Sequence, residues 1–362
     1  MRDLEFILRM HGTECKAYYA ALADLTREAP VYEDRGEFVC GTPDLCTWLL
    51  KHDAVTRPML SFEKNLATLP LDDAERRQLA MTTEVVDQLL ARSIFGNRNG
   101  TASEWFAWLS ELCNADALDQ IARKHLRKIP PRTLYDFMQI ARSYIADIAC
   151  LVAGVHSDFT QAYERPIAAM VDYMDGRVNT RADALRAAAG VKAVADKLSS
   201  EDCNDLLPAA LRADIPNRTM FLIAAHESSA YLIATACLML KRTPDLTTQK
   251  AVRAAADFDF PIQSVLRETT EDLRWGDFHL PRGRRIRIHI GAAFGGGRQP
   301  NKSFGIGANV CPGAKLAVAA AEALINNFRP LLPQTAFFER NRHTSLAART
   351  FRRLNAFTDY IS

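Results

Sequence analysis

The segment that most constrains this chain is a glycine-rich loop at residues 304–313, Phe-Gly-Ile-Gly-Ala-Asn-Val-Cys-Pro-Gly, followed at once by an apolar run. Gly305 and Gly307 permit positive φ and a close backbone approach to a flat ligand, so the loop can fold tightly. Pro312 suits the first position of a helix, where its missing N–H costs nothing. We therefore expect Cys311 at a helix N-terminus, where unpaired N–H groups and the helix dipole favour the thiolate.

The composition is that of a compact, water-soluble protein, with 48% hydrophobic and 24% charged residues. Lys and Arg number 45 against 43 Asp and Glu, without long runs of like charge, so the sequence does not support a nucleic-acid partner. The N-terminus lacks a signal-peptide pattern, and we expect a cytoplasmic protein. Residues 219–240 are long enough to span a bilayer, but polar residues at 226–229 interrupt them, which favours a buried core helix and no membrane insertion.

Hydrophobic residues repeated every three or four positions predict a mainly α protein. The expected helices cover 72–95, 104–124, 133–154, 160–175, 181–198, 218–241 and 312–328. Strand-like segments are few: residues 31–41 resemble a hairpin with a turn at 34–36, and residues 284–290 alternate polar and apolar side chains. No internal repeat or linker interrupts the chain, so we expect a single helical domain over 1–362 with a small β-sheet at one edge.

The loop matches Phe-Gly-x-Gly-x-x-x-Cys-x-Gly, and in this the chain resembles the cytochrome P-450 superfamily. The resemblance implies the cytochrome P-450 fold and haem b (iron protoporphyrin IX) as the cofactor. It implies that Cys311 is the axial iron ligand and that Phe304 packs near the sulfur, while Gly305, Gly307 and Gly313 form the loop. A thiolate ligand directs electron density toward iron-bound oxygen. The alternative is a buried helix-capping cysteine beside a Gly-rich turn.

Within this loop, Asn309 departs from the family pattern, in which most members place His or Arg to bind a haem propionate. Asn offers only a neutral hydrogen bond, which weakens that contact. Arg267, in the Pro-x-Gln-x-x-x-Arg segment at 261–267, is then the expected propionate ligand, unless it forms an ordinary surface salt bridge. Candidate substitutes for the missing propionate contact are Arg298, Lys302 and His289.

Two further parts of the family pattern are missing. The Glu-x-x-Arg pair expected on the helix before residue 260 is replaced by Lys250 and Arg253, which repel each other. A Glu-x-x-Arg sequence does occur at 271–274, but it falls in a strand and turn region. The segment that normally separates the sheet from the cysteine loop is shortened to residues 294–303.

The expected helix at 218–241 carries a second motif, Ala224-Ala225-His226-Glu227-Ser228, which resembles the family segment over the distal face of the haem. Small side chains at Ala224 and Ala225 allow close approach to the haem and room for dioxygen. The Ser228 hydroxyl can bond back to the carbonyl of Ala224 and widen the helix. We expect burial to raise the pKa of Glu227, which could then carry protons to bound oxygen. The alternative is a satisfied polar notch in which Glu227 pairs with an arginine.

Together these features predict an oxygen-activating monooxygenase of specialised metabolism that acts on a small organic molecule, free or carrier-bound. A ferredoxin or flavodoxin-type protein would supply its electrons. The shortened 294–303 segment keeps a second hypothesis open, a peroxide-using, rearranging or dehydrating enzyme that needs no reductase. A third is a non-catalytic haem-binding homologue, for which Asn309 and the missing Glu-x-x-Arg pair argue. The sequence does not identify the substrate, whose pocket we expect to be lined by 80–108, 155–185 and 219–230.

Overall fold

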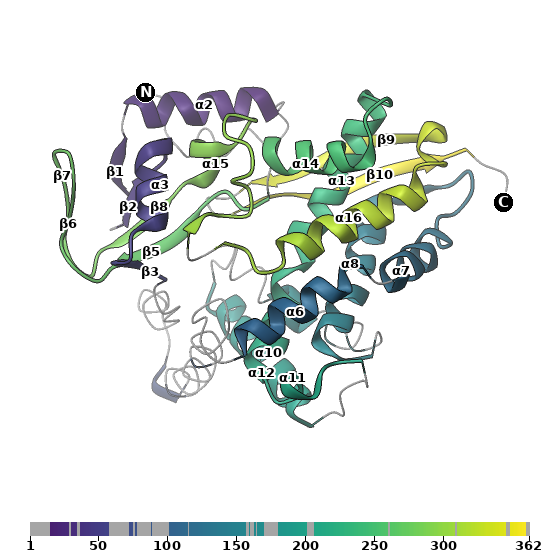
Figure 1. Ribbon diagram of the computed structural model, residues 1–362, viewed down its shortest axis with the longest axis horizontal. Helices are drawn as coiled ribbons and strands as arrows, with labels where there is room; N and C mark the ends of the chain where they lie inside the picture. The colour runs from purple at the N-terminus through teal and green to yellow at the C-terminus, as the bar shows by residue number, and fades with distance from the viewer. Residues whose placement is uncertain are drawn as a thin grey trace.

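The computed structural model describes the greater part of the chain, and helices predominate in it (Figure 1). The residues it describes are 15–28, 30–34, 37–57, 72–74, 101–114, 116–156, 165–169, 180–200, 206–259, 261–307, 310–344 and 348–359, with the single positions 77, 88, 159 and 163. Most of the helices expected at 72–95 and 160–175 lie outside these residues.

The helices fall into two groups (Figure 1). The larger group comprises α6 (Ala102–Leu112), α7 (Asp116–Leu126), α8 (Phe137–Ala153), α10 (Arg181–Ser200), α11 (Ala209–Arg212), α12 (Ile215–Ala224), α13 (His226–Arg242), α14 (Thr248–Phe258) and α16 (Ala314–Phe328). The smaller group lies beside the main sheet and comprises α2 (Cys15–Glu28), α3 (Pro43–Lys51) and α15 (Ile290–Phe294).

Ten short or medium strands form the sheets, in the part of the chain that the structure describes. They are β1 (Val31–Asp34), β2 (Glu37–Cys40), β3 (Val55–Thr56), β4 (Leu134–Asp136), β5 (Val265–Thr269), β6 (Leu273–Trp275), β7 (Phe278–Leu280), β8 (Arg285–Ile288), β9 (Thr335–Thr344) and β10 (Arg349–Thr358). The main sheet has the order β1-β2-β8-β5-β3, in which only β2 and β8 run parallel. A second sheet, β4-β10-β9, borders the larger helical group, and β6 and β7 form a separate hairpin.

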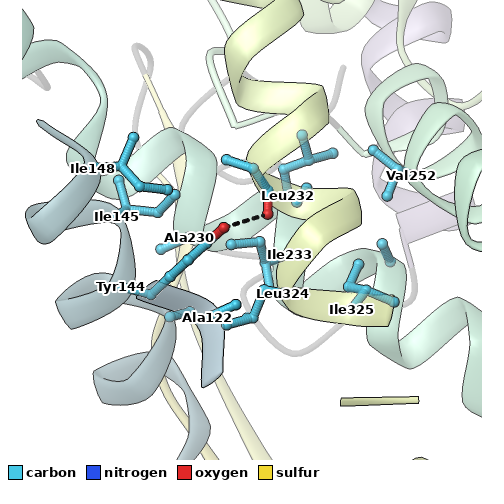
Figure 2. Close-up of a cluster of buried hydrophobic side chains, with 14 of the residues drawn as sticks. Ala122, Tyr144, Ile145, Ile148, Ala230, Leu232, Ile233, Val252, Leu324 and Ile325 are labelled. Atoms are coloured by element: carbon cyan, nitrogen blue, oxygen red, sulfur yellow. Dashed lines mark hydrogen bonds between the residues drawn. The ribbon is translucent and has the colours of Figure 1, made fainter. Parts of the chain in front are cut away.

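The main hydrophobic core lies where α8, α13, α14 and α16 meet (Figure 2). Each helix contributes an apolar stripe with three- and four-residue spacing, and the stripes interdigitate. Ile145, Ile233, Val252 and Leu324 are at most 2% exposed. The Tyr144 hydroxyl, whose ring lies within this cluster, donates to the backbone carbonyl of Ala320 at 2.9 Å and so joins α8 to α16. Full burial of each such side chain contributes roughly 1.5–3 kcal/mol, so this core fixes the position of α13.

Several sequence expectations are confirmed: the hairpin of β1 and β2, strand β8 and helix α10 lie where periodicity placed them. The segment Ile215–Arg242 is long and apolar enough to cross a membrane, and 72% of its most apolar window is buried inside the protein, as expected of a core helix.

Other expectations were wrong at element boundaries. Residues 104–124 form two helices, α6 and α7, and residues 133–154 begin with β4. Helix α16 begins at Ala314, so Pro312 precedes the helix rather than opening it. The sheet is not a single edge sheet, because β9 and β10 build a second one that the sequence pattern did not indicate. Charged side chains interrupt these two strands, so their alternation is weak.

The Asp136 side chain stabilises the start of α8 and its contact with β10. One carboxylate oxygen accepts hydrogen bonds from the backbone N–H of Met138 and of Leu354, each at 3.0 Å. We expect Asp136→Ala to lower the free energy of unfolding by about 1–2 kcal/mol. Asp136→Asn, the matched control, keeps an acceptor oxygen and should lose less than half as much. Urea unfolding followed by circular dichroism measures both, and equal losses would contradict the capping role.

Candidate functional site

The glycine-rich loop closes on itself just before α16. The backbone N–H of Cys311 donates to the carbonyl of Phe304 at 2.8 Å, which brings the two ends of the loop together. Gly305 and Gly307 have φ of 82° and 70°, a region that favours glycine, as the sequence predicted. A Cβ on Gly307 would lie 2.6 Å from the carbonyl oxygen of Leu50, at the end of α3. The loop therefore needs glycine at 307 for conformation and for space. The Phe304 side chain packs against the main hydrophobic core.

The Cys311 thiol lies in a more apolar place than a helix N-terminus alone would give. Burial raises its pKa above the ordinary value, against the opposite effects of the Gly313 backbone N–H and the Arg57 charge. The expected lowering of the thiol pKa was wrong, because α16 begins after Cys311 and burial outweighs the nearby N–H group. A cationic ligand at the sulfur would reverse this balance, since coordination deprotonates a thiol.

The charge of Arg57 acts on both the Cys311 thiol and a second arginine, Arg267. Arg267, on β5, is 6% exposed, and its Nη1 donates to the carbonyl of Leu266 at 2.7 Å. Burial, with the charge of Arg57, lowers the pKa of Arg267 to about 10. Among the described residues, the buried Nε of Arg267 has no hydrogen-bond partner. A buried guanidinium whose Nε has no partner among the described residues is suited to an anionic ligand. Its 6% exposure does not fit the surface salt bridge that was the alternative.

The other basic residues considered for this site make contacts within the protein, although the buried Nε2 of His289 has no hydrogen-bond partner among the described residues. Arg298 donates to the carbonyls of Ala292 and Gly295 at 2.9 and 3.1 Å. The Lys302 ammonium lies 5.3 Å from the centre of the Phe294 ring. His289 accepts from the Ala292 N–H at 3.1 Å, and burial lowers its pKa to about 4, so its ring is neutral. Arg267 therefore remains the strongest candidate for an anionic ligand.

Asn309 lies outside the described residues. Lys250 and Arg253, which stand where the Glu-x-x-Arg pair was expected, are exposed on α14. The Glu-x-x-Arg sequence at 271–274 runs from a turn into β6, as the sequence indicated.

The second motif interrupts the long core helix. Helix α12 ends at Ala224 and α13 begins at His226, with Ala225 between them. The Ser228 hydroxyl donates to the carbonyl of Ala224 at 3.4 Å, which is the bond that the sequence predicted. The expected local distortion of this helix is therefore confirmed, and it occurs at the small residues Ala224 and Ala225.

Glu227 forms an ion pair with Arg142, which no sequence pattern singled out. Arg142, on α8, donates from Nε to one carboxylate oxygen at 2.7 Å and from Nη2 to the other at 3.1 Å. The same guanidinium donates to the carbonyls of Phe351 and Arg352, at 2.7 and 3.1 Å, and so joins α8, α13 and β10.

This pairing reverses the expected ionisation of Glu227. Although burial by itself raises the pKa, the nearby His226 ring, whose Nδ1 lies 3.7 Å from the carboxylate, and the Arg142 guanidinium lower it to about 2. The expectation of a raised pKa was wrong, because it considered the burial of Glu227 but not the Arg142 guanidinium on α8. At neutral pH the carboxyl is an ion. The one available signal was Arg142 itself, a positive charge in a largely apolar helix whose one other charged residue is Asp147.

Known proteins resemble this chain over a short stretch in sequence and over nearly its whole length in fold. No protein-family model matches the sequence. Beta-dihydromenaquinone-9 omega-hydroxylase of Mycobacterium tuberculosis is 30% identical over 129 residues. That match covers 29% of this chain and 26% of the relative, so the chain spans about a quarter of the relative's length.

Solved structures match over nearly the whole chain. P450BioI in complex with an acyl carrier protein ligated to hexadec-9Z-enoic acid has a TM-score of 0.74 at 15% identity and covers 95% of this chain and 98% of its own. Epothilone D-bound cytochrome P450epoK has a TM-score of 0.74 at 15% identity and covers 96% of this chain and 97% of its own. Mycobacterium smegmatis CYP164A2 has a TM-score of 0.70 at 18% identity, and the match covers 98% of each chain. At such identities the likeness establishes a shared fold.

Two glycines of the loop provide a matched test of its geometry. Gly307 has positive φ and no room for a Cβ, whereas Gly313 has a φ of −87° and nothing within 4 Å of an added Cβ. We expect Gly307→Ala to lower the free energy of unfolding by about 1–3 kcal/mol and Gly313→Ala by at most about 0.5 kcal/mol. Denaturant unfolding of the two variants measures this difference, and similar losses would refute the proposed loop conformation.

The Glu227 ion pair predicts a pH dependence of stability. The folded-state pKa, about 2, is below the ordinary value of 4.5, so the stabilisation is complete above about pH 4.5 and is lost as the pH falls toward 2. Between pH 5 and 3 we expect the wild type to lose about 2 kcal/mol more than Glu227→Gln. Urea unfolding at each pH measures both slopes. Parallel slopes would mean that the carboxyl is not held as an ion in the folded protein.

Proposed function

We propose, from the cytochrome P450 fold of this chain, that it is a haem-thiolate monooxygenase acting on a small organic molecule in specialised metabolism. The observation that carries the proposal is the closed loop around Cys311. Arg267 supports it, since its buried Nε has no hydrogen-bond partner among the described residues and the charge of Arg57 acts on both Arg267 and Cys311. The loop presents one sulfur ligand, and the guanidinium is suited to an anionic group. Haem carries both an iron and carboxylates, so these residues fit it.

Haem b is the form of cofactor that we propose. Cys311 would hold the iron, and Arg267, with Arg57 nearby, would neutralise a propionate. The bound group would supply iron-based oxygen activation, tuned by the thiolate ligand. The left-handed Gly305 and Gly307 would let the loop backbone pass close to the flat ring. We assign Phe304, Gly313 and Asn309 to the same cofactor site.

On the distal side, we propose that Ala224 and Ala225 leave space above the ring, and that Ser228 and Glu227 take part in proton transfer. Among the described residues, the Ser228 hydroxyl has one long contact of 3.4 Å, so it can exchange partners with little loss. Glu227 is ionised and bound at both oxygens by Arg142, so it can take up a proton only when this ion pair opens. Proton transfer through Glu227 is therefore coupled to a separation of α13 from Arg142.

Known similar proteins indicate the range of substrates and partners. One relative hydroxylates a menaquinone, one structure holds a fatty acid on an acyl carrier protein, and another holds epothilone D. We propose a small organic substrate, free or carrier-bound, and a ferredoxin or flavodoxin-type electron donor in the cytoplasm. Most of the segments expected to line the substrate pocket, 80–108 and 155–185, lie outside the described residues.

A peroxide-using or reductase-independent enzyme is the second candidate, and two observations favour it. The connection between α15 and the cysteine loop is limited to residues 295–303. Glu227 is held as an ion, which hinders proton delivery. Turnover with peroxide and none with reductase and ferredoxin would establish this candidate, and the reverse result would exclude it.

Replacement of the proposed ligand is the direct test. We expect the purified wild type, loaded with haem, reduced and exposed to carbon monoxide, to show the Soret shift typical of thiolate ligation, and Cys311→Ser to lose it. Cys113→Ser is the matched control, because Cys113 is a half-buried thiol bound to the carbonyl of Leu109 and should leave the spectrum unchanged. A wild type that binds haem without this shift would refute the proposal. If Cys311→Ala kept the biological function of the wild type, the protein would be a non-catalytic homologue.

A further inference from the structure

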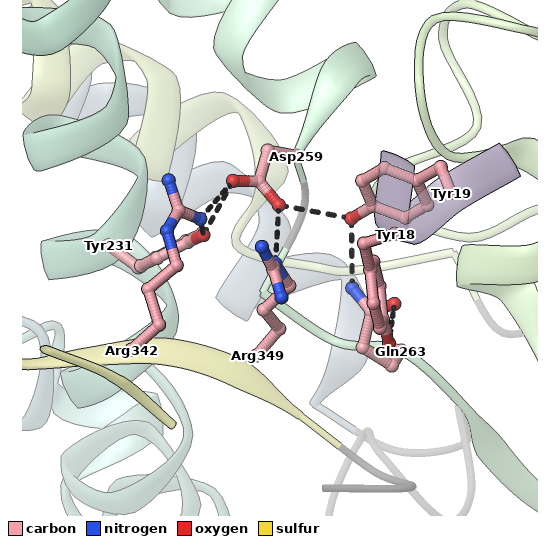
Figure 3. A network of polar contacts seen from close by, with 7 residues as sticks. All are labelled: Tyr18, Tyr19, Tyr231, Asp259, Gln263, Arg342 and Arg349. Carbon is pink, nitrogen blue, oxygen red and sulfur yellow. Dashed lines mark hydrogen bonds and ion pairs between the residues drawn. The ribbon is translucent and has the colours of Figure 1, made fainter. Parts of the chain in front are cut away.

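A buried carboxylate, Asp259, accepts hydrogen bonds from polar groups of four other segments (Figure 3). Its Oδ1 accepts hydrogen bonds from the Tyr19 hydroxyl at 3.1 Å and from Arg349 Nε at 3.2 Å. Its Oδ2 accepts from the Tyr231 hydroxyl at 2.6 Å and from Arg342 Nη1 at 2.5 Å. These residues belong to α2, α13, β9 and β10, while Asp259 directly follows α14.

The network is almost completely shielded from water. Asp259 is 2% exposed, and Tyr19, Tyr231 and Arg349 are no more so. The Arg342 guanidinium lies 4.4 Å from the centre of the Phe351 ring, which encloses it further. Charges buried to this extent interact strongly, and removal of one leaves its partners without compensation. The position of the backbone at Asp259 is therefore tightly fixed.

The backbone just before Asp259 holds the connection that leads to the cysteine loop. The carbonyl of Phe258 accepts from the Gly296 N–H at 2.9 Å, and that of Asp257 accepts from the Gly297 N–H at 3.2 Å. The Asp257 side chain accepts from the Asn301 N–H at 2.8 Å. The last turn of α14, through Asp257 and Phe258, thus binds the 296–301 connection at three points.

Tyr19 reinforces this arrangement from the opposite side. Its side chain lies directly on this backbone, because a Cβ added to Gly295 would come within 2.3 Å of the Tyr19 ring, and one added to Gly296 within 3.1 Å of the Tyr19 Cβ. The Tyr19 hydroxyl also accepts from Gln263 Nε2 at 3.1 Å, and the Gln263 carbonyl accepts from the Gly291 N–H at 2.9 Å. The connection is thus enclosed between groups that all depend on Asp259.

The 296–301 connection leads directly into the Cys311 loop and is hydrogen-bonded next to it. The carbonyl of Lys302, the residue after Asn301, accepts from the Gly305 N–H at 3.0 Å, and Phe304 then closes the loop on Cys311 at 2.8 Å. We propose that Asp259 is the positioning residue of the Cys311 loop, acting through the α14 terminus and residues 296–301. Its effect on the haem rests on the proposed function, whereas its effect on the loop does not.

The first test compares local hydrogen exchange in two Asp→Asn variants of the full chain. We expect Asp259→Asn to speed exchange of the Gly296, Gly297, Asn301 and Cys311 amides about tenfold or more, while the core amides of α8 change far less. Asp147→Asn is the matched control. Asp147 is likewise largely buried and paired, with Lys124 and His125 of α7 at 2.8 Å each, and should leave the loop amides unchanged.

A milder variant keeps the proposal testable if Asp259→Asn does not fold. Tyr19→Phe removes one hydrogen bond to Asp259 but keeps the ring on Gly295, so exchange should rise at the same loop amides, less than in Asp259→Asn. Uniform acceleration across the chain would indicate a general loss of stability and overturn the proposal. Loop amides unchanged in both variants would overturn it as well.

A spectroscopic readout separates this proposal from the proposed function. In haem-loaded protein, Asp259→Asn should convert at least about half of the reduced, carbon monoxide-bound form from the thiolate-type Soret band to the band without thiolate, and Asp147→Asn should not. An unchanged band ratio in Asp259→Asn would overturn the proposed positioning of the ligand. If the wild type itself never shows the thiolate band, the haem function fails, and the exchange data still decide whether Asp259 positions the loop.

Discussion

The packing of α8, α13 and α16 around one apolar core is the constraint on which both halves of the candidate site depend. Helix α13 carries the distal motif at its N-terminus, and α16 follows the cysteine loop, so burial of their apolar stripes sets the distance between the two motifs. Each fully buried side chain contributes roughly 1.5–3 kcal/mol, and such contributions accumulate over the length of three helices. Loops that join elements held in this way have few alternative conformations.

Buried ion pairs between these packed helices and strands then set the electrostatics of the candidate site. Glu227 and Asp259 are both carboxylates in largely apolar surroundings, and both are paired with guanidinium groups from distant parts of the chain. The Arg142–Glu227 pair determines the protonation of the distal helix, and the Asp259 network supports the proximal loop. Arg267 differs from them, because its buried Nε has no partner among the described residues and remains available for an anionic ligand.

The sequence predicted the fold class, the cysteine loop with its two left-handed glycines, and the bond from Ser228 to Ala224. These features depend on residues close together in the chain, where conformation and spacing are local properties. It did not predict the second sheet, whose strands are interrupted by charges, or the start of α16 at Ala314. It also placed the pKa shifts of Cys311 and Glu227 in the wrong direction.

The sequence by itself determined which side chains are available and where the glycines allow the backbone to turn. Tertiary structure alone decided the charge state of Glu227 and the position of the loop around Cys311. Arg142 lies 85 residues from Glu227, and Tyr19 lies 240 residues from Asp259. Electrostatic energy depends on distance in space and on burial, and neither quantity exists until the helices have packed.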